Sequence, residues 1–256
     1  MDDLKVLITG GAGNIGKSIA SFLVKQKIKV LLTDIRDDLG YKITESFNFS
    51  GIKYIHLDVR KEGDWIKTFE TNPDINILIN NAGIIGFGRN WGPQDPENQT
   101  FESWHEVHSV NLDGVFLGSK HFIVTNKNRT GKIINIASRS GVVGVPTCAA
   151  YASSKAAVRN HTKTVALYCA NKKYDISCNA ILPASIDTDM WGQDLIRRRN
   201  INKLSMGIPV KRFGKPEDVA ELVLFLVTME SKYITGAEFC VDGGVLAGSI
   251  FSPIPY

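Results

Sequence analysis

Tyr151 and Lys155, in the segment YASSK, are a pair of residues that could move a proton. They are four residues apart, so their side chains lie on the same face if the segment is helical. A free phenol has a pKa of about 10, which is too high for a general base at neutral pH. A nearby ammonium group stabilises the phenolate and lowers that pKa. An isolated Tyr–Lys pair is usually an ordinary contact on a helix surface, so its meaning depends on the rest of the chain.

The glycine-rich segment TGGAGNIGKS, residues 9–18, could bind phosphate and fits two known motifs. From Gly11 onward it has the GxxxxGKS spacing of the P-loop in ATP- and GTP-binding proteins. Gly10, Gly13 and Gly16 also resemble the glycine turn of a dinucleotide-binding βαβ unit. In both motifs backbone N–H groups at a helix N-terminus face the phosphate, so the segment alone does not separate them.

The end of the second expected strand favours the dinucleotide. The strand VLLTD ends in Asp34, where a dinucleotide-binding fold places an acid that binds the adenosine ribose hydroxyls. A P-loop protein could instead use this strand to hold magnesium. Under the dinucleotide interpretation, Lys17 faces solvent on the first helix, as most lysines do.

Composition limits the class of protein. With 256 residues, 43% hydrophobic and 22% charged, the chain suits one large α/β domain or two small ones. A net charge of +4 is too small to indicate a nucleic-acid partner, and we see neither a signal peptide nor an apolar run long enough to span a membrane. We therefore expect a cytoplasmic protein without nucleic-acid or membrane partners. The cysteines form no CxxC pair or zinc-ligand spacing, so we expect no metal site and four buried thiols: Cys148, Cys169, Cys178 and Cys240.

Short apolar runs alternate with helix-length segments along the chain. Expected strands are 5–9, 29–33, 53–58, 76–80, 132–137, 176–181 and 238–241, and expected helices are 15–26, 62–70, 101–124, 149–170 and 217–229. This alternation predicts a single α/β domain over residues 1–256, a Rossmann-like, doubly wound parallel sheet of about seven strands with helices on both faces. Two long segments, 84–100 and 183–212, follow strands and are expected at the substrate side, and 245–256 is an apolar tail.

Further motifs follow in order: LDV (57–59), NNAG (80–83), VNLDGVF around Asn111, IINIAS ending in Ser138, and VDGG (241–244). Together with TGGAGNIG and a Ser-x12-Tyr-x3-Lys spacing, they make the chain resemble the short-chain dehydrogenase/reductase family nearly end to end. The sequences of these motifs most resemble those of bacterial alcohol and hydroxysteroid dehydrogenases. Asn14 replaces a glycine usual in this family, and we expect it to tolerate a left-handed backbone. Ala184 replaces the glycine that usually follows Pro183, and 84–100 seems longer than in typical members.

The resemblance implies hydride transfer between a nicotinamide and the carbinol or carbonyl carbon of a secondary alcohol or ketone. Tyr151 is then the acid/base. Lys155 lowers its pKa and binds the nicotinamide ribose. Ser138 orients the substrate oxygen, and Asn111 holds a water in a proton path to the lysine.

Asp34 favours NAD over NADP, because a carboxylate accepts from ribose hydroxyls and repels a 2′-phosphate. Arg36 is a contrary hint, since a nearby arginine can accommodate that phosphate. Asp58 is expected at the adenine edge and Thr188 at the carboxamide. The full expected set of cofactor contacts is Gly10, Gly13, Asn14, Ile15, Gly16, Asp34, Ile35, Asp58, Val59, Asn81, Ala82, Gly83, Tyr151, Lys155, Pro183, Ile186 and Thr188.

The substrate is expected to be a small molecule that contacts Ser138, Tyr151, Met190 and Trp191. Additional apolar residues of the two long segments, Phe87, Trp91 and Leu195, suit a hydrophobic or cyclic, steroid-like alcohol, although they could equally pack the loops. A 3-oxoacyl-(acyl carrier protein) reductase, whose partner Arg197–Arg199 could meet, and a sugar dehydrogenase are alternatives. A P-loop NTPase and a non-catalytic dinucleotide-binding protein are alternatives of another class. The family implies a homotetramer, in which the tail 250–256 is expected to pack on a neighbouring subunit.

Overall fold

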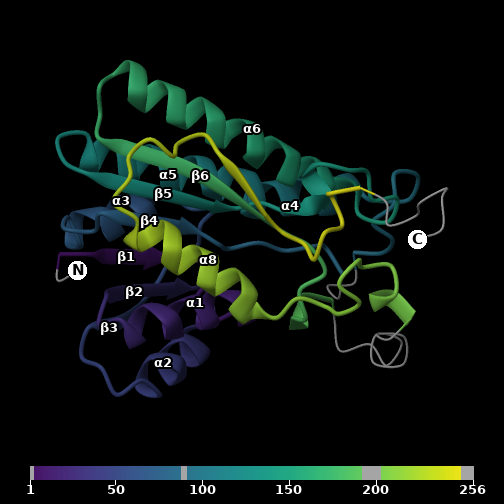
Figure 1. Ribbon diagram of the computed structural model, residues 1–256, viewed down its shortest axis with the longest axis horizontal. Helices are drawn as coiled ribbons and strands as arrows, with labels where there is room; N and C mark the ends of the chain where they lie inside the picture. The colour runs from purple at the N-terminus through teal and green to yellow at the C-terminus, as the bar shows by residue number, and fades with distance from the viewer. Residues whose placement is uncertain (1–2, 88–90, 192–202, 249–256) are drawn as a thin grey trace, which may run out of the picture.

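The computed structural model describes residues 3–87, 91–191 and 203–248, which contain a seven-stranded parallel sheet (Figure 1). Its order is β3-β2-β1-β4-β5-β6-β7. The order reverses between β1 and β4, which is where a doubly wound fold binds its ligand. The strands are β1 (Lys5–Ile8), β2 (Lys29–Asp34), β3 (Ile52–His56), β4 (Ile77–Asn80), β5 (Gly131–Ile136), β6 (Ile176–Pro183) and β7 (Glu238–Val241). The predicted fold class is confirmed.

Neighbouring residues of the central strands belong to different halves of the core. In β1, Val6 and Ile8 pack in one apolar cluster and Leu7 in the other, all fully buried. In β4, Ile79 and Leu78 divide in the same way. Successive side chains of a strand point to opposite faces of the sheet. Both faces are therefore covered, which explains why these strands are continuous apolar runs.

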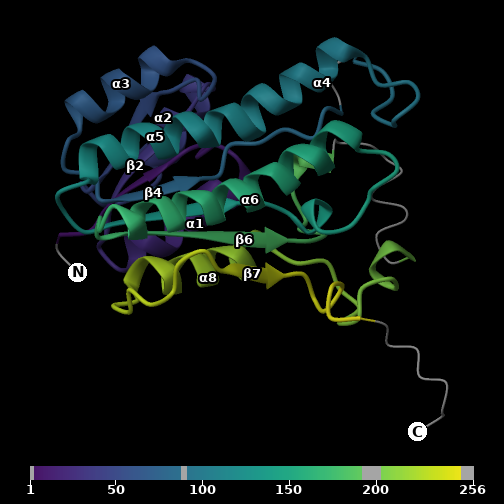
Figure 2. The same cartoon turned by 90° about the horizontal axis from the view of Figure 1, so that it is seen from above.

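The helices cover the two faces separately, as the two views show (Figures 1 and 2). One face carries α1 (Asn14–Lys25), α2 (Asp37–Glu45) and α8 (Pro216–Thr228), and the other carries α3 (Glu62–Thr71), α4 (Phe101–His108), α5 (Gly114–Asn126) and α6 (Ala149–Asn171). The largest fully buried side chain, Trp65 of α3, lies in the second layer and donates its ring N–H to Val59 O at 3.0 Å. Both helix layers bury their apolar side chains against the faces of one sheet. The ends of the strands lie outside these faces and carry polar residues.

Two helical features differ from the prediction. The expected helix over 101–124 is interrupted by a π-helical turn, η1 (Ser109–Asp113), which contains Asn111. Such turns insert one residue into a helix and are common at functional sites. Helix α2 was not predicted, because its sequence DDLGYKITE carries a glycine. Gly40 is required there, since a Cβ at this position would overlap the Tyr54 ring.

The carboxyl ends of the strands meet at one end of the sheet, which is the right-hand end in Figure 2. The segments after β4, β5 and β6 all leave the sheet here, including the described parts of 84–100 and 183–212. Both segments therefore lie at the edge where an open α/β sheet binds ligands.

The cysteine prediction is wrong at one position. Cys148, Cys169 and Cys178 are buried, but Cys240 is exposed because it lies on β7, the edge strand of the sheet. Among the helices that the structure describes, none is long and apolar enough to cross a membrane.

Candidate active site

The glycine segment forms a tight turn between β1 and α1. Gly10 has φ +61°, and a Cβ on it would lie 2.7 Å from Ala82 Cα. A Cβ on Gly16 would lie 2.5 Å from Gly10 O, so these two glycines let the backbone fold closely on itself. Within the described residues, Gly13 at the N-cap has no side-chain capping bond and the first turn of α1 has no acid. A helix N-terminus of this kind fits the phosphates of a dinucleotide.

Two residues of this segment bear on the competing motifs. Lys17 is exposed on α1, as the dinucleotide interpretation predicted. Asn14 is the first residue of α1 and is not among the residues with positive φ, so the turn does not use the tolerance of asparagine for a left-handed backbone. Because the helix begins at this residue, its backbone is helical. Its Oδ1 instead accepts a hydrogen bond from Asp189 N–H at 3.2 Å, which joins the glycine turn to the segment after β6.

Thr9 fixes the glycine turn against the end of β4. Its buried Oγ1 accepts hydrogen bonds from the N–H groups of Asn81 and Ala82, both at 3.0 Å. The Asn81 side chain donates to Thr9 O at 2.9 Å and to Gly10 O at 3.1 Å. Thr9 was missed by the sequence prediction, although a polar residue at the end of an apolar strand was a usable signal.

Asp34 and Asp58 end neighbouring strands and share one geometry. Asp34 Oδ1 accepts from the backbone N–H and Nε of Arg36, both at 3.1 Å, and its Oδ2 accepts from Arg36 Nη2 at 3.2 Å. Asp58 makes the corresponding three bonds with Arg60 at 3.1, 2.9 and 2.8 Å. The hydrogen bond from the Arg60 guanidinium lowers the pKa of Asp58, against the opposing effect of burial. Both carboxylates are buried, so each strand end presents a fixed negative group.

Two apolar residues accompany these carboxylates. Ile35 is 47% exposed beside Asp34, whereas Val59 is buried. Ile35 is a predicted cofactor contact. An exposed isoleucine at this edge offers an apolar surface against which a flat ring could pack.

Ser138, Tyr151 and Lys155 come from the end of β5 and the first turns of α6. Ser138 Oγ accepts the N–H of Ser140 at 3.1 Å, and the Ser138 side chain lies close enough to the Tyr151 phenol to oppose the rise of its pKa. Lys155 is 3% exposed, and its Nζ donates to Ile136 O at 2.8 Å and lies 5.8 Å from the centroid of the Tyr151 ring. The structure thus brings together three of the four predicted catalytic residues.

The pKa of Tyr151 differs from the prediction. Burial raises it, and the Ser138 hydrogen bond and the charge of Arg139 oppose that rise. Burial also lowers the pKa of Lys155 to about 8. The expectation that Lys155 lowers the phenol pKa is not met in this structure, because burial disfavours the charged form of both groups.

Asn111 is fully buried in the π-helical turn and holds the backbone beside Gly83. Its Oδ1 accepts Ile84 N–H at 2.8 Å, and its Nδ2 donates to Ile84 O at 2.9 Å and Ser154 Oγ at 3.1 Å. A Cβ on Gly83 would lie 3.3 Å from both Asn111 Oδ1 and Lys155 Nζ, so these three residues meet. The π-helical turn therefore places the fourth predicted residue at the same site.

The segment after β6 carries the last three predicted cofactor contacts. Pro183 ends β6, Ile186 and Thr188 are buried, and Met190 is 38% exposed. The left-handed residue of this turn is Ser185, with φ +51°, so Ala184 needs no unusual backbone. The side chain of Trp191, together with Leu195, Arg197–Arg199 and the tail 250–256, lies outside the described residues.

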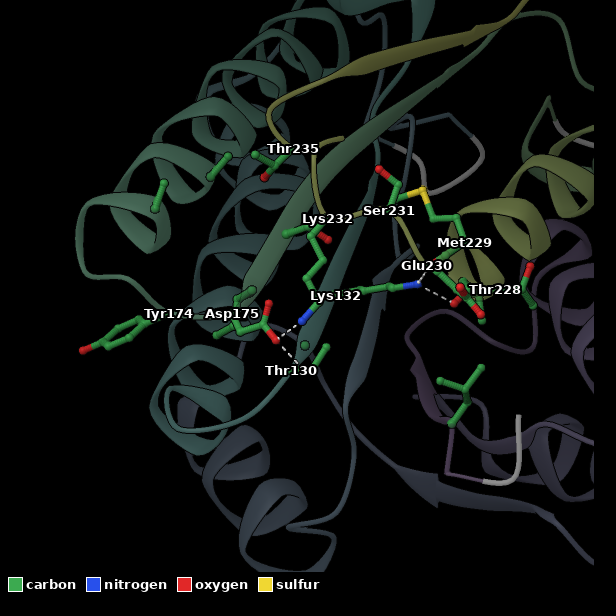
Figure 3. Close-up of a pocket in the computed structure, with 17 residues that line it drawn as sticks. Thr130, Lys132, Tyr174, Asp175, Thr228, Met229, Glu230, Ser231, Lys232 and Thr235 are labelled. Carbon is green, nitrogen blue, oxygen red and sulfur yellow. Dashed lines mark hydrogen bonds and ion pairs between the residues drawn. The ribbon is translucent and has the colours of Figure 1, made fainter.

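A cavity of about 440 Å³ lies at the opposite end of the sheet, between the ends of α6 and α8 (Figure 3). The Lys132 side chain extends along it. Its Nζ donates to Leu226 O at 3.2 Å and Val227 O at 2.8 Å, which satisfies carbonyl groups at the end of α8. The cavity contains none of the predicted site residues. The ammonium group of Lys132 therefore has a structural explanation in helix capping.

Several known proteins are similar to this chain over nearly its whole length. A family model described as "Enoyl-(Acyl carrier protein) reductase" matches residues 10–246. An NADP-dependent (R)-specific alcohol dehydrogenase of Lentilactobacillus kefiri is 37% identical over 248 residues, which cover 94% of this chain and 96% of the relative. A cyclopentanol dehydrogenase of Comamonas sp. is 34% identical over 254 residues, covering 96% and 98%. The solved structure of a 3-ketoacyl-(acyl-carrier-protein) reductase from Brucella melitensis, complexed with NADH, has a TM-score of 0.85 at 27% identity, with 95% and 98% coverage. The chain therefore belongs to the short-chain dehydrogenase/reductase family of oxidoreductases.

Proposed function

We propose that the chain interconverts a secondary alcohol and a ketone with NAD(H), using Tyr151 as the acid/base. The observation that carries this proposal is the meeting of Ser138, which acts on the pKa of the Tyr151 phenol, with the buried Lys155, whose Nζ lies 5.8 Å from the centroid of the Tyr151 ring. A bound nicotinamide supplies or accepts the hydride. The protein's own groups then have to handle the proton on the substrate oxygen.

The hydrogen bonds of the site support this division of roles. Ser138 Oγ already accepts the Ser140 N–H, so the Ser138 hydroxyl hydrogen is free to point at a substrate oxygen or at Tyr151. During alcohol oxidation the substrate hydroxyl gives its proton to the Tyr151 phenolate, and during ketone reduction the phenol returns it. With a pKa of about 8, Lys155 is mostly charged at neutral pH and can exchange a proton under mildly alkaline conditions.

The cofactor preference rests on Asp34. Its buried carboxylate lies where the adenosine ribose is expected, and a 2′-phosphate at that place would meet a fixed negative charge. The similar proteins differ in this respect, since the Lentilactobacillus relative is NADP-dependent and the Brucella structure holds NADH. We propose NAD as the preferred cofactor and treat Arg36 as the residue that limits the preference.

We propose a hydrophobic or cyclic secondary alcohol as the substrate. Phe87 and Met190, 40% and 38% exposed, present apolar surface from the segments that follow β4 and β6. The name of the Comamonas relative, a cyclopentanol dehydrogenase, supports a cyclic substrate. A 3-oxoacyl thioester is the second candidate, favoured by the name of the Brucella structure.

The test is oxidation of NADH and NADPH with a panel of linear, cyclic and steroid ketones and an acetoacetyl thioester. Tyr151→Phe keeps the aromatic ring and removes the hydroxyl. We expect its kcat/KM to fall by at least about 100-fold, because general acid catalysis is lost. Its affinity for NADH, measured by fluorescence, should stay unchanged. Full turnover by Tyr151→Phe would contradict the proposed mechanism, and turnover with NADPH alone would contradict the cofactor proposal.

A further inference from the structure

Helix α6, which carries Tyr151 in its first turn, is capped from a distant segment. The first N–H groups of a helix have no partner within the helix. The side chain of the N-cap residue Cys148 makes no capping bond. Ala149 N–H instead donates to Gln94 O at 2.9 Å, and Ala150 N–H donates to Gln99 Oε1 at 3.1 Å. The segment that follows β4 therefore satisfies the start of the helix that follows β5.

Gln99 is held in place by a small polar cluster, which we call the Gln94–Gln99–Ser103 cluster. Gln99 Nε2 donates to Gln94 Oε1 at 2.8 Å and to Ser103 Oγ at 3.3 Å. Ser103 Oγ donates to Gln94 Oε1 at 2.9 Å. Gln94 and Ser103 are 2% and 0% exposed, so these bonds are shielded from water. Gly86, with φ +94°, leaves the room for Gln94, since a Cβ there would overlap its side-chain oxygen.

We propose that Gln99 is a positioning residue for Tyr151. It acts through the backbone of Ala150, the residue next to Tyr151, and the rest of the cluster fixes its side chain. The Tyr151 phenol has to meet both Ser138 and the substrate oxygen, and displacements well below the size of an atom cost rate in such sites. Gln99 thereby couples the substrate-side segment 84–100 to the acid/base. This inference rests on the proposed function of Tyr151.

Three variants test it. Gln99→Leu keeps the side-chain size and removes the acceptor for Ala150 N–H. Gln99→Glu keeps an acceptor for Ala150 N–H and adds a negative charge at the start of α6, and it loses the Nε2 donor to Gln94 and Ser103. Ser103→Ala is the matched control, because it removes two hydrogen bonds from the same cluster and leaves both caps of α6 in place.

Gln99→Leu should lower kcat for alcohol oxidation about 5-fold, the loss expected for one capping bond, with little change in KM for NAD. Ser103→Ala should keep the wild-type kcat. Gln99→Glu should keep the cap but move the acid limb of the kcat/KM–pH profile upward by about half a unit, because a nearby negative charge disfavours the phenolate. A purely structural role for Gln99 would change KM for NAD together with kcat in Gln99→Leu, so the split between these two constants separates the roles.

Amide hydrogen exchange of the peptide that covers the first turn of α6 provides a readout that needs no substrate. It should become faster in Gln99→Leu and stay at the wild-type rate in Gln99→Glu and Ser103→Ala. Equal exchange in Gln99→Leu and the wild type would overturn the inference, as would an unshifted pH profile in Gln99→Glu. If the wild type reduced no ketone, the proposed function would fail by itself, and the exchange experiment would still decide whether Gln99 caps α6.

Discussion

Replacing Arg36 by Met should make the protein bind NADH more tightly and NADPH less tightly. Asp34 accepts four hydrogen bonds in the structure: from the N–H groups of Ala12 and Arg36, at 3.0 and 3.1 Å, and from Nε and Nη2 of the Arg36 side chain. A carboxylate has about four acceptor positions. The ribose hydroxyls of NADH can bind Asp34 only where the guanidinium leaves, so Arg36 competes with the preferred cofactor.

The size of the effect follows from the exposure of the two partners. The Arg36 side chain is 53% exposed and Asp34 is 5% exposed. An ion pair with one partner in solvent contributes about 0.5 to 1 kcal/mol net. Arg36→Met should therefore tighten NADH binding by roughly 2- to 5-fold. The NADPH phosphate would lose a charge-assisted partner, so its binding should weaken by about 10-fold or more.

The assay is fluorescence titration of both reduced cofactors at one fixed ionic strength, because exposed ion pairs are screened by salt. Arg60→Met is the matched control. Arg60 holds Asp58 in the same geometry one strand away and also pairs with Glu106 at 3.1 Å. We expect Arg60→Met to leave the ratio of the two affinities unchanged. The reasoning is refuted if Arg36→Met weakens NADH binding, or if it changes both affinities by the same factor.

Two further predictions concern Lys155 and the glycine turn. Burial lowers the pKa of Lys155 from 10.5 to about 8, so between these pH values the unfolded chain binds more protons and the free energy of unfolding should rise with pH, by up to about 3 kcal/mol. Urea unfolding of Lys155→Met at pH 8 and 10 should lack this rise, and an equal rise in both proteins would contradict it. Gly16→Ala should lower the free energy of unfolding by about 2 kcal/mol, because its Cβ would meet the backbone of Gly10 and Gly11. Gly13→Ala, whose Cβ would approach nothing closer than 3.4 Å, should keep the stability but weaken NADH binding, and an equal loss of stability in both variants would contradict the proposed roles.

The strands and the edge that carries the site were predictable, because both follow from local patterns. Continuous apolar runs such as β4 indicate strands covered on both faces. The residues after these runs reach one edge simply because the strands are parallel. The π-helical turn was not predictable in this way, since Asn111 enters it through bonds to Ile84 and Ser154, which are 27 and 43 residues away.

Partners that are distant in sequence limited the prediction of the site. The spacing of Asp34 and Arg36 was visible in the sequence, but the competition between Arg36 and the ribose requires the additional bond from Ala12 N–H. Gln99 stood unremarked in a polar segment, and its partner Ala150 is 51 residues away. A capping residue next to its helix has a sequence signal. A capping residue supplied by a distant loop has no such signal in the sequence.

Tyr151 shows why a correctly interpreted spacing can still predict the wrong direction for a pKa shift. The four-residue interval does place Tyr151 and Lys155 close together, with Nζ 5.8 Å from the ring centroid. The sequence could not show that Lys155 Nζ donates to Ile136 O, or that both side chains are removed from water. Burial then raises the pKa of the phenol and lowers that of the ammonium group to about 8. Burial thus favours the neutral phenol and the neutral amine, whereas attraction between charges would favour the phenolate and the ammonium group. The acid/base function proposed for this pair therefore depends on the packing that buries it as much as on the spacing that first indicated it.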